Sequence, residues 1–574
     1  MSIFKFLDDD IRNQKNLSLS AQINPSKGPP EHGLLLSVYH EDSGAMLLRR
    51  TFPTYGYFSY GFDVIWWLKR LQKGRIAVIT IKGGGIVGLF SVRNELENLG
   101  SVFISSIPQF CHWIWIFMVG GVTLLETFSL EISPLKVHST IHHRSPAMLN
   151  QTNTYESVNQ KLCSRLESLG TYCDPDLYNK LLQRIKLKKH SNQNPKIGII
   201  IFTGVRPQYL IETIESSFKC KEVFGSDIIA TVGTSFQTKQ VNEDIITILT
   251  DIGIEYRIVE SFTKSNNSSK YVESFHYYSK SISIAAESFK NFDFIVFLDE
   301  DVIVSPDWMH MLSYAAPILN TDTSLWCISP SSGARVQGGD PKKLIRGLKQ
   351  PGYGFLMSLA LIIEILPSMN PGEEALHDLW LMNFMNDREC IFPEIGRSQH
   401  FGIGINTIPE VHQLYSIDAN LYHGPYVPFT KLVDLEKHKY SNQIIYELQH
   451  GKAYNKNPCK PGFFETEPSI VDSVFVFAYA LHEDQLLPYW ANLAECLGLY
   501  PHSIKNMHNF TVPLSLPNGN VVWLVGVPHS SFSPYVLEDV PVWDYKKDLD
   551  ENPPILLPNY SNYTYDNIVN DIFY

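Results

Sequence analysis

Through the middle of the chain, continuous apolar runs alternate with amphipathic segments, which is the pattern of a sheet covered by helices on both faces. Ile197–Phe202 is apolar apart from Gly198, as expected of a parallel strand buried on both sides. Further strands are expected at 227–232, 255–259 and 292–298, and helices at 209–218 and 277–289. We therefore predict an α/β domain over residues 195–430, with a doubly wound mixed sheet that binds its ligands at the C-terminal strand ends.

A separate module is predicted before this domain. Residues 1–31 are polar and end in two prolines, so we interpret them as a polar tail. From Gly33 the pattern changes to a hairpin with Asp42-Ser43-Gly44 as its turn. Helices are then expected at 62–71 and 92–99, and strands at 75–81, at 102–104 and on both sides of Gly120-Gly121. This pattern indicates an α+β or β-sandwich module over residues 32–136.

Two further segments flank the α/β domain. Residues 137–194 are mostly polar and predict a linker with one or two short helices, and Cys163 and Cys173 are close enough in this linker to close a small loop. Residues 431–574 are expected to form a C-terminal region that packs on the α/β domain. Its expected elements are strands at 474–479 and 521–527, a helix at 485–496 and an irregular Pro-rich end.

Composition narrows the choice of function. The chain has 574 residues, of which 44% are hydrophobic and 18% charged, and a net charge of −12 without a long basic run argues against a nucleic-acid partner. None of the eight cysteines forms a CxxC pair, which argues against a zinc site. The first sixteen residues carry no apolar run. The apolar stretches at 113–125 and 355–366 are shorter than the roughly 20 residues that span a bilayer.

The strongest chemical signal is an acidic triplet, Asp299-Glu300-Asp301, placed directly after the apolar run Ile295–Leu298. Burying unpaired carboxylates is costly, so such a cluster at a strand end normally holds a cation. In sugar-nucleotide transferases that metal neutralises the leaving diphosphate. The alternative is an acidic loop after a buried strand. We expect Asp301, at the end of the triplet, to be the metal ligand.

Several segments of this domain resemble family-13 glycosyltransferases, which include N-acetylglucosaminyltransferase I and the protein O-mannose enzyme. Phe292–His310 and Ser324–Ser329 resemble the metal-site region of the family. Pro351–Phe355 is similar to its Pro-Gly-Leu-Gly-Trp segment, and Asp387–Ser398 to its Arg-x-Cys-x-x-Pro-x-x-Ser-Arg run, which is followed by Gln399–Gly402. The segments stand in the family's order, and the resemblance implies a nucleotide-sugar transferase fold of the GT-A type.

The N-terminal module also resembles part of the O-mannose enzyme. Gly33–Lys136, with Arg50, Gly74-Arg75-Ile76 and Leu99-Gly100-Ser101, is similar to its stem domain. That domain shares its fold with interleukin-like secreted factors and binds glycans. N-acetylglucosaminyltransferase I lacks a stem of this kind, so the domain order favours the O-mannose subgroup.

The resemblance also implies disulfides. Cys163 and Cys173 match a pair in the enzyme's linker, and Cys459 and Cys496 match a pair in its C-terminal region. We further predict a third disulfide, which ties the segment after the metal strand to the segment after the base, and we leave the last two cysteines free or unassigned. The third pair is Cys327–Cys390, and the remaining cysteines are Cys111 and Cys220.

Site roles follow from the matching positions. Arg206, after the first strand, is expected to contact the nucleotide diphosphate, with Glu300 and Asp301 beside it. Asp378, in His377-Asp378-Leu379-Trp380, matches the family's catalytic base, which takes the proton of the acceptor hydroxyl. A loop salt bridge and a helix-surface carboxylate are the respective alternatives. His400 is expected to lie behind the metal ligand without touching the metal.

The resemblance implies an inverting transferase that moves N-acetylglucosamine from UDP-GlcNAc, with Mn²⁺, in β-1,2 linkage to O-linked mannose on glycoproteins. An N-glycan mannose acceptor and a weakly active homologue that binds glycans are the alternatives. Four departures from the family bear on them. In three of these, the Trp-Asn-Asp after Cys-Ile-Ser is replaced by Pro330–Gly333, the Trp before the base is His377, and an Asp near the uracil is Val232. The first residue of the acidic triplet is Asp299 where the family has Glu.

Partners and location are likewise implied by the resemblance. The expected partners are UDP-GlcNAc, an O-mannosylated glycoprotein and a glycan at the stem module, and the chain could form a dimer. The expected location is the lumenal side of the Golgi membrane, with a single-pass type II anchor that is not visible in this sequence.

Overall fold

The computed structural model divides the chain into two compact units, Met1–Gln183 and Arg184–Tyr574, which are described separately. The boundary falls inside the segment expected to be a linker. The structure describes residues 15–23, 33–41, 44–52, 54, 60–81, 83–108, 111–130, 135–143, 159–186, 195–223, 227–234, 241–260, 270–332, 339–347, 354–369, 385, 388–401, 421–460, 462–481, 486–497, 499 and 507–544. None of the helices within these ranges is both long enough and apolar enough to cross a bilayer.

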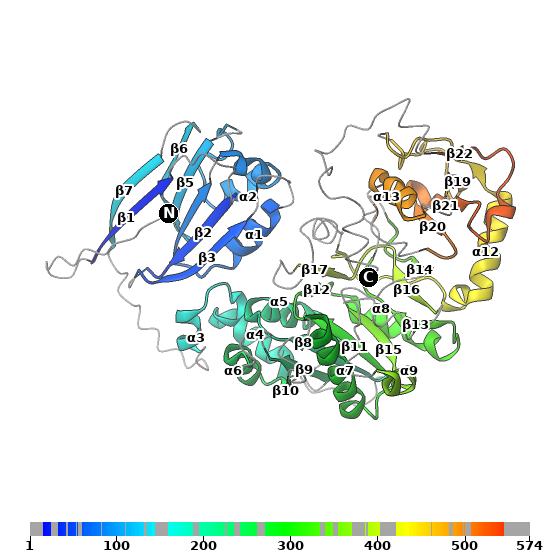
Figure 1. The fold of residues 1–574 in the computed structure, drawn as a ribbon, viewed down its shortest axis with the longest axis horizontal. Coiled ribbons are helices and arrows are strands. Elements are labelled where there is room, and N and C mark those ends of the chain that lie inside the picture. Colours follow the sequence, from blue (N-terminus) through cyan, green and yellow to red (C-terminus); the bar gives the residue numbers. More distant parts are fainter. Residues whose placement is uncertain are drawn as a thin grey trace. The chain divides into compact units, whose positions relative to one another are not determined.

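The first unit is built on a five-stranded antiparallel sheet of order β3-β2-β4-β5-β6 (Figure 1). Its strands are β2 (Leu34–Tyr39), β3 (Met46–Phe52), β4 (Ile76–Ile81), β5 (Cys111–Met118) and β6 (Thr123–Leu130), and its helices include α1 (Tyr60–Arg70) and α2 (Arg93–Asn98). The side chains of β5 are buried on both faces of the strand, Trp113 and Trp115 among them. The predicted hairpin, both helices and the strand pair around Gly120-Gly121 are confirmed.

Two features of this unit differ from the sequence prediction. The strand expected at 102–104 is wrong: these residues form turns, and Val102 and Phe103 are exposed. Gly100, directly before this segment, adopts a positive φ. The carboxylate of Glu126 accepts hydrogen bonds from the backbone N–H groups of Val102 and Phe103, so these groups are not available for pairing with another strand. Within the predicted polar tail, β1 (Lys15–Ile23) pairs antiparallel with β7 (Leu135–His143).

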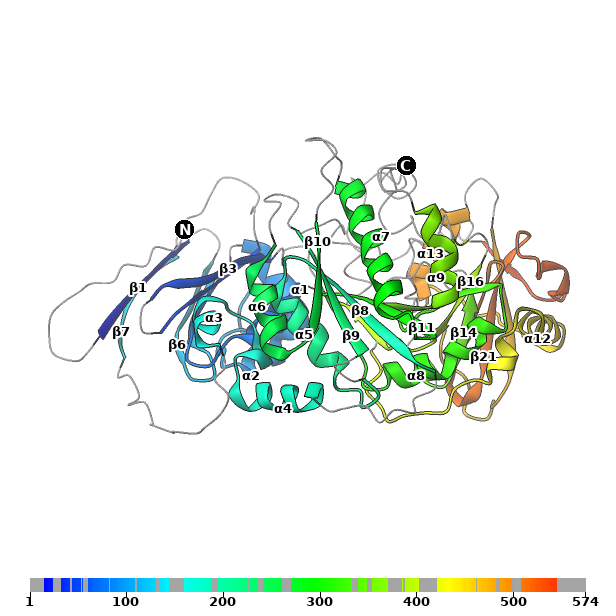
Figure 2. The same ribbon diagram turned by 90° about the horizontal axis from the view of Figure 1, so that it is seen from below.

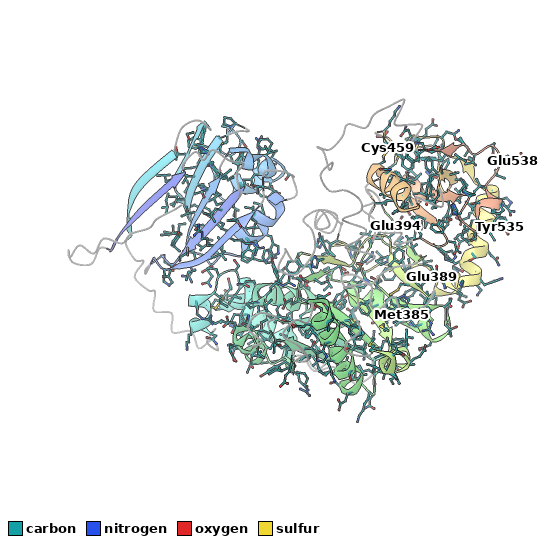
Figure 3. All side chains as sticks on the ribbon, in the orientation of Figure 1. Met385, Glu389, Glu394, Cys459, Tyr535 and Glu538 are labelled. Carbon is teal, nitrogen blue, oxygen red and sulfur yellow. A yellow bond between two sulfur atoms is a disulfide. The ribbon has the colours of Figure 1, made fainter. Side chains whose placement is uncertain are left out.

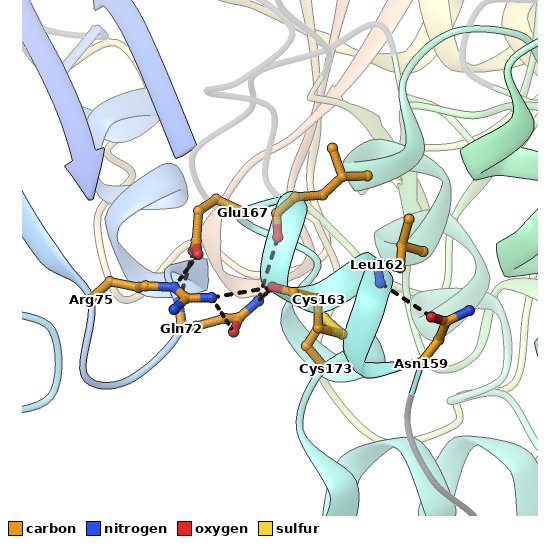
Figure 4. Close-up of a disulfide and its surroundings, with 8 residues drawn as sticks. Gln72, Arg75, Asn159, Leu162, Cys163, Glu167 and Cys173 are labelled. Atoms are coloured by element: carbon orange, nitrogen blue, oxygen red, sulfur yellow. Dashed lines mark hydrogen bonds and ion pairs between the residues drawn. A yellow bond between two sulfur atoms is a disulfide. The ribbon is translucent and has the colours of Figure 1, made fainter. Parts of the chain in front are cut away.

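A disulfide-closed segment belongs to this first unit. The predicted Cys163–Cys173 bond is present and joins α3 (Gln160–Arg165) to the turn before α4 (Pro175–Lys186). Arg75, at the start of β4, holds this segment: its Nε lies 2.5 Å from Glu167 Oε1, and its Nη2 donates to the carbonyl of Cys163 at 3.2 Å (Figure 4). Both side chains are buried, so the Glu167 carboxylate depends on this guanidinium for its neutralisation, while Arg75 also contacts Glu41 at 2.8 Å.

The second unit centres on an eight-stranded mixed sheet of order β10-β9-β8-β11-β15-β13-β16-β14. Its first four strands in this order run parallel, and β15 and β14 run antiparallel to their neighbours. The strands are β8 (Ile197–Thr203), β9 (Ile228–Gly233), β10 (Glu255–Val259), β11 (Phe294–Asp299), β13 (Leu325–Ile328), β14 (Leu344–Gly347), β15 (Phe355–Ser358) and β16 (Glu389–Pro393). The predicted α/β class and its four parallel strands are confirmed.

Helices cover both faces of this sheet. Its helices are α5 (Pro207–Ser217), α6 (Glu243–Ile252), α7 (Lys270–Ser288), α8 (Trp308–Ala315) and α9 (Leu359–Ile365). In Figure 2, α7 and α9 lie on one side of the sheet and α8 on the other. One apolar core joins α7 and α9 to the strands through Phe275, Ile282 and Ile362, and it includes the predicted disulfide Cys327–Cys390. That disulfide links the neighbouring strands β13 and β16.

The C-terminal part forms a smaller sheet of order β18-β19-β21-β20, with β22 beside β19. Its elements are α12 (Lys437–His450), β18 (Lys452–Ala453), β19 (Val474–Ala480), α13 (Leu486–Leu497), β20 (Thr511–Ser515), β21 (Val521–Val527) and β22 (Val542–Trp543). The predicted strands, the helix and the disulfide Cys459–Cys496 are confirmed. The remaining cysteines, Cys111 and Cys220, are buried free thiols. The Pro-rich end at 553–574 lies outside the described residues.

Two buried glutamates join this small sheet and its helix to the large sheet (labelled in Figure 3). Glu389 in β16 accepts from Arg346 Nε at 2.5 Å and lies 2.6 Å from His508 Nδ1, and the other ring nitrogen of His508 contacts Ser441 of α12 at 3.0 Å. Glu394 accepts from the backbone and the hydroxyl of Ser515 in β20, at 2.7 and 2.6 Å. The contact surface is therefore polar and fully paired at these points.

Replacing Arg75 by methionine should destabilise the first unit by about 3–5 kcal/mol, because it leaves the buried Glu167 carboxylate without its charged partner. Urea unfolding followed by tryptophan fluorescence measures the loss. Lys69→Met, at an exposed position of α1, is the control and should change stability by less than about 0.5 kcal/mol. A loss for Arg75→Met no larger than that of the control would contradict the assignment.

Acid should weaken the second unit partly through Glu389. Burial favours a higher pKa for this carboxyl, but the hydrogen bonds and charges of His508 and Arg346 outweigh burial and lower it. A group whose pKa is lower in the folded state than in the unfolded state stabilises the fold at pH values above its unfolded pKa of about 4.3. This stabilisation is lost as the pH falls through the folded pKa. The melting temperature of Glu389→Gln should therefore fall less steeply than that of wild type below about pH 4.5. Glu364→Gln, at an exposed position, should keep the wild-type slope.

Candidate donor site

The predicted site residues meet where the order of the parallel strands reverses. From β8 the chain runs outward to β9 and β10 and then returns to place β11 on the other side of β8. In a sheet of this kind the crevice beyond the two strand ends is the ligand site. Phe202 and Asp299 are paired at these ends, so the turn after β8 and the acidic turn after β11 lie side by side.

Glu300 is used inside the protein. Its side chain is buried, and its Oε2 accepts from Thr203 Oγ1 at 2.6 Å and from the N–H of Gly204 at 2.9 Å. Its Oε1 accepts from Arg206 Nε at 2.8 Å. Three donors from one turn therefore converge on this carboxylate. Glu300 was predicted to contact the donor substrate. In the structure, its hydrogen bonds fix the turn that carries Arg206.

Asp301 is paired with two basic side chains. Its Oδ2 lies 2.6 Å from Arg206 Nη2 and 3.0 Å from His400 Nε2, and only 3% of the residue is exposed. Burial favours a higher pKa for Asp301, but the charges and hydrogen bonds of His400 and Arg206 hold it far below the ordinary value. This carboxylate therefore stays ionised at every physiological pH. The structure thus brings Arg206, Glu300 and Asp301 together, as predicted.

A short two-stranded ladder delivers His400 to the site. β12 (Val302–Val304) pairs antiparallel with β17 (Ser398–His400), and Val302 stands opposite His400. The N–H of Phe401 also donates to the carbonyl of Asp301 at 3.0 Å. His400 therefore contacts the carboxylate of Asp301 through a fixed backbone register.

Two hydroxyls of α5 hold the backbone on both sides of Asp301, and the sequence analysis missed them. Thr213 Oγ1 donates to the carbonyl of Glu300 at 2.6 Å and accepts from the N–H of Val302 at 3.2 Å. Ser216 Oγ accepts from the N–H of Val304 at 3.3 Å. Both residues are fully buried on a helix whose other inward positions are largely apolar, and that contrast is the signal that could have identified them.

Of the remaining residues that the sequence analysis singled out, some are described by the structure and others are not. Asp299 accepts from the hydroxyl of Tyr278 at 3.1 Å. Val232, at the position where the family has an acid near the uracil, is fully buried in β9 and belongs to the core. Asp378, the predicted base, lies outside the described residues, together with most of Pro351–Phe355 and His377.

The acidic turn offers carboxylate oxygens, which are the ligands that a hard divalent cation prefers. Among the described residues there is no group of three or more His, Cys, Asp and Glu side chains that could enclose a metal. Both oxygens of Glu300 accept hydrogen bonds from the turn after β8, so Asp299 and Asp301 are the carboxylates of the acidic turn that remain as hard oxygen donors. This set fits a cation that takes one protein carboxylate and completes its shell with diphosphate oxygens and water.

Part of this chain is similar to a known protein family. Residues 174–436 match the model of the GNT-I family, a segment that contains the large sheet and the whole donor site. The match supports a GNT-I-related glycosyltransferase. Two crystal structures of TarS from S. aureus are also similar, each at 12% identity. One covers 39% of this chain and 38% of its own with a TM-score of 0.24, and the other, residues 1–349 with UDP-GlcNAc, covers 53% and 81% with a TM-score of 0.26.

Thr213→Val should weaken the site without changing its shape. The substitution keeps the volume of the side chain but leaves the carbonyl of Glu300 and the N–H of Val302 unpaired, at a cost of about 1–3 kcal/mol. Thr213→Ser keeps the hydroxyl and is the matched control, with a smaller loss from the missing methyl group. Chemical denaturation compares the two variants, and a valine variant as stable as the serine variant would refute the role of the hydroxyl.

Proposed function

We propose that this protein is an inverting glycosyltransferase that moves N-acetylglucosamine from UDP-GlcNAc in β-1,2 linkage to O-linked mannose on glycoproteins. The observation that carries the proposal is the meeting of Arg206 and Asp301 at the strand reversal, inside the segment that matches the GNT-I family. A guanidinium and an ionised carboxylate at this crevice supply the two contacts that a metal-bound diphosphate requires.

Each residue has a separate part in this reaction. Asp301 would hold Mn²⁺, which supplies charge neutralisation for the leaving diphosphate when it is bound. Arg206 would contact the diphosphate oxygens. Glu300, through Thr203, Gly204 and Arg206, keeps the guanidinium at the mouth of the crevice. These residues orient the donor and stabilise negative charge as it develops on the leaving group.

Transfer itself needs a base. The acceptor hydroxyl loses its proton to Asp378 while its oxygen forms a bond to the anomeric carbon, and the bond from that carbon to the diphosphate oxygen breaks. One displacement inverts the carbon, so no enzyme nucleophile takes part. UDP leaves with the electron pair of the broken bond.

The other parts of the proposal rest on the sequence resemblance. The first unit would act as a stem that binds glycan, and the enzyme would work on the lumenal side of the Golgi membrane. A weakly active, glycan-binding homologue is the second candidate. The burial of Val232 favours it, because this position offers no acid to a nucleotide base.

The assay that tests the proposal is UDP release from UDP-GlcNAc with Mn²⁺ and an O-mannosyl peptide. Asp378→Asn should keep donor affinity but lose turnover by roughly 10²–10⁴-fold, the usual share of a general base. Asp301→Ala should lose both donor binding and turnover. Asp251→Asn, on the exposed face of α6, is the control and should keep both.

Three results would count against this proposal. Transfer that survives in Asp378→Asn would show that another residue is the base. Donor binding that survives in Asp301→Ala would remove the metal site from the acidic turn. Absence of wild-type transfer, with glycan binding intact, would favour the glycan-binding homologue.

A further inference from the structure

In this structure the carboxylate of Asp301 is paired with the positive charge of the Arg206 guanidinium. The guanidinium spans two carboxylates, with Nε 2.8 Å from Glu300 Oε1 and Nη2 2.6 Å from Asp301 Oδ2. About a fifth of the arginine side chain is exposed, at 19%, whereas the Asp301 side chain is 4% exposed. A ligand arriving from solvent therefore meets the guanidinium more readily than the carboxylate behind it.

We propose that a divalent cation reaches Asp301 only together with a diphosphate, because the diphosphate must take Arg206 Nη2 in exchange for Asp301. This inference rests on the proposed function and adds a binding rule to it: metal and nucleotide bind jointly, and Arg206 is the residue that couples them.

Charge explains why either ligand alone binds poorly. A cation on Asp301 would share its carboxylate with the guanidinium, and two positive charges a few ångströms apart beside a side chain that is only 4% exposed repel strongly. A diphosphate alone would meet the carboxylates of Glu300 and Asp301, which lie against the guanidinium. The cation and the diphosphate together bring nearly equal and opposite charge, and each relieves the repulsion that the other would meet.

The turn after β8 allows this exchange without unfolding. Arg206 has two separate anchors: Nε on Glu300 and Nη2 on Asp301. Glu300 is itself fixed by Thr203 Oγ1 and by the N–H of Gly204. The rigid guanidinium can therefore pivot as a whole about its Nε contact with Glu300, which carries Nη2 from Asp301 toward a phosphate oxygen. His400 keeps one hydrogen bond to Asp301 during the exchange.

The experiment measures binding of Mn²⁺ and UDP to the full chain. Free Mn²⁺ is followed by its electron paramagnetic resonance signal, with and without UDP, and UDP binding by calorimetry. Wild type should bind Mn²⁺ at least about 10-fold more tightly when UDP is present, within the usual range of coupling between two ligands.

Arg206→Gln should change the two affinities in opposite directions. Mn²⁺ alone should bind more tightly than in wild type, UDP alone more weakly, and the coupling should fall several-fold. Arg206→Lys keeps the charge and should leave Mn²⁺ alone weakly bound. Arg257→Gln, at an exposed position on β10, is the matched control and should behave as wild type. A purely structural role of Arg206 would weaken both ligands together and would not raise metal affinity.

The failures can be told apart. Equal Mn²⁺ affinity with and without UDP in wild type, or weaker Mn²⁺ binding in Arg206→Gln, would overturn the exchange and leave the transferase standing if wild type still releases UDP. Wild type that binds no UDP under any condition would overturn the exchange and the proposed function together.

Discussion

The candidate donor site depends on the pairing of buried carboxylates at the end of β11. An apolar strand that delivers Glu300 and Asp301 into the protein interior would be unstable if their charges were left alone. The turn after β8 supplies the compensation, with Thr203, Gly204 and Arg206 on Glu300 and the same arginine on Asp301. The electrostatic need of one strand end thus fixes the conformation of its neighbour.

The same need explains the position of α5. Pro207 occupies the start of this helix, where its missing N–H leaves no donor unpaired, and Arg206 stands directly before it. The helix then passes under the acidic turn, and Thr213 pairs the peptide groups on both sides of Asp301. One helix therefore begins beside the guanidinium and holds the carboxylate, so that two groups far apart in the sequence keep a constant separation.

The sequence was sufficient for the parallel strands and for placing Arg206 and the acidic triplet at the ends of neighbouring strands. The continuous apolar runs of β8 and β11 predict buried strands, and an acidic triplet directly after such a run indicates a site for a charged ligand at the strand end. The sequence could not predict contacts that leave no periodic pattern of apolar and polar residues. The pairing of β12 with β17 involves three residues on each side and depends on the course of the intervening chain. Glu300 had the residue type of a ligand contact, and only its three partners show that it is an anchor.

The segment from Glu389 to Phe401 carries the last constraint on the site. Glu389 contacts His508, and Glu394 contacts Ser515, so both are tied to the C-terminal part of the chain. Farther along, Arg397 pairs with Asp307 before α8, and His400 reaches Asp301.

These side chains follow one another on one short stretch of backbone. A displacement of the small sheet would therefore change the position of His400. A buried ion pair contributes little net stability compared with the apolar contacts that could stand in its place. The protein is strongly destabilised, however, when one partner of the pair moves away. The value of such pairs in this segment is therefore positional. The C-terminal part of the chain, which supplies no predicted catalytic group, thus anchors the segment that brings His400 to Asp301.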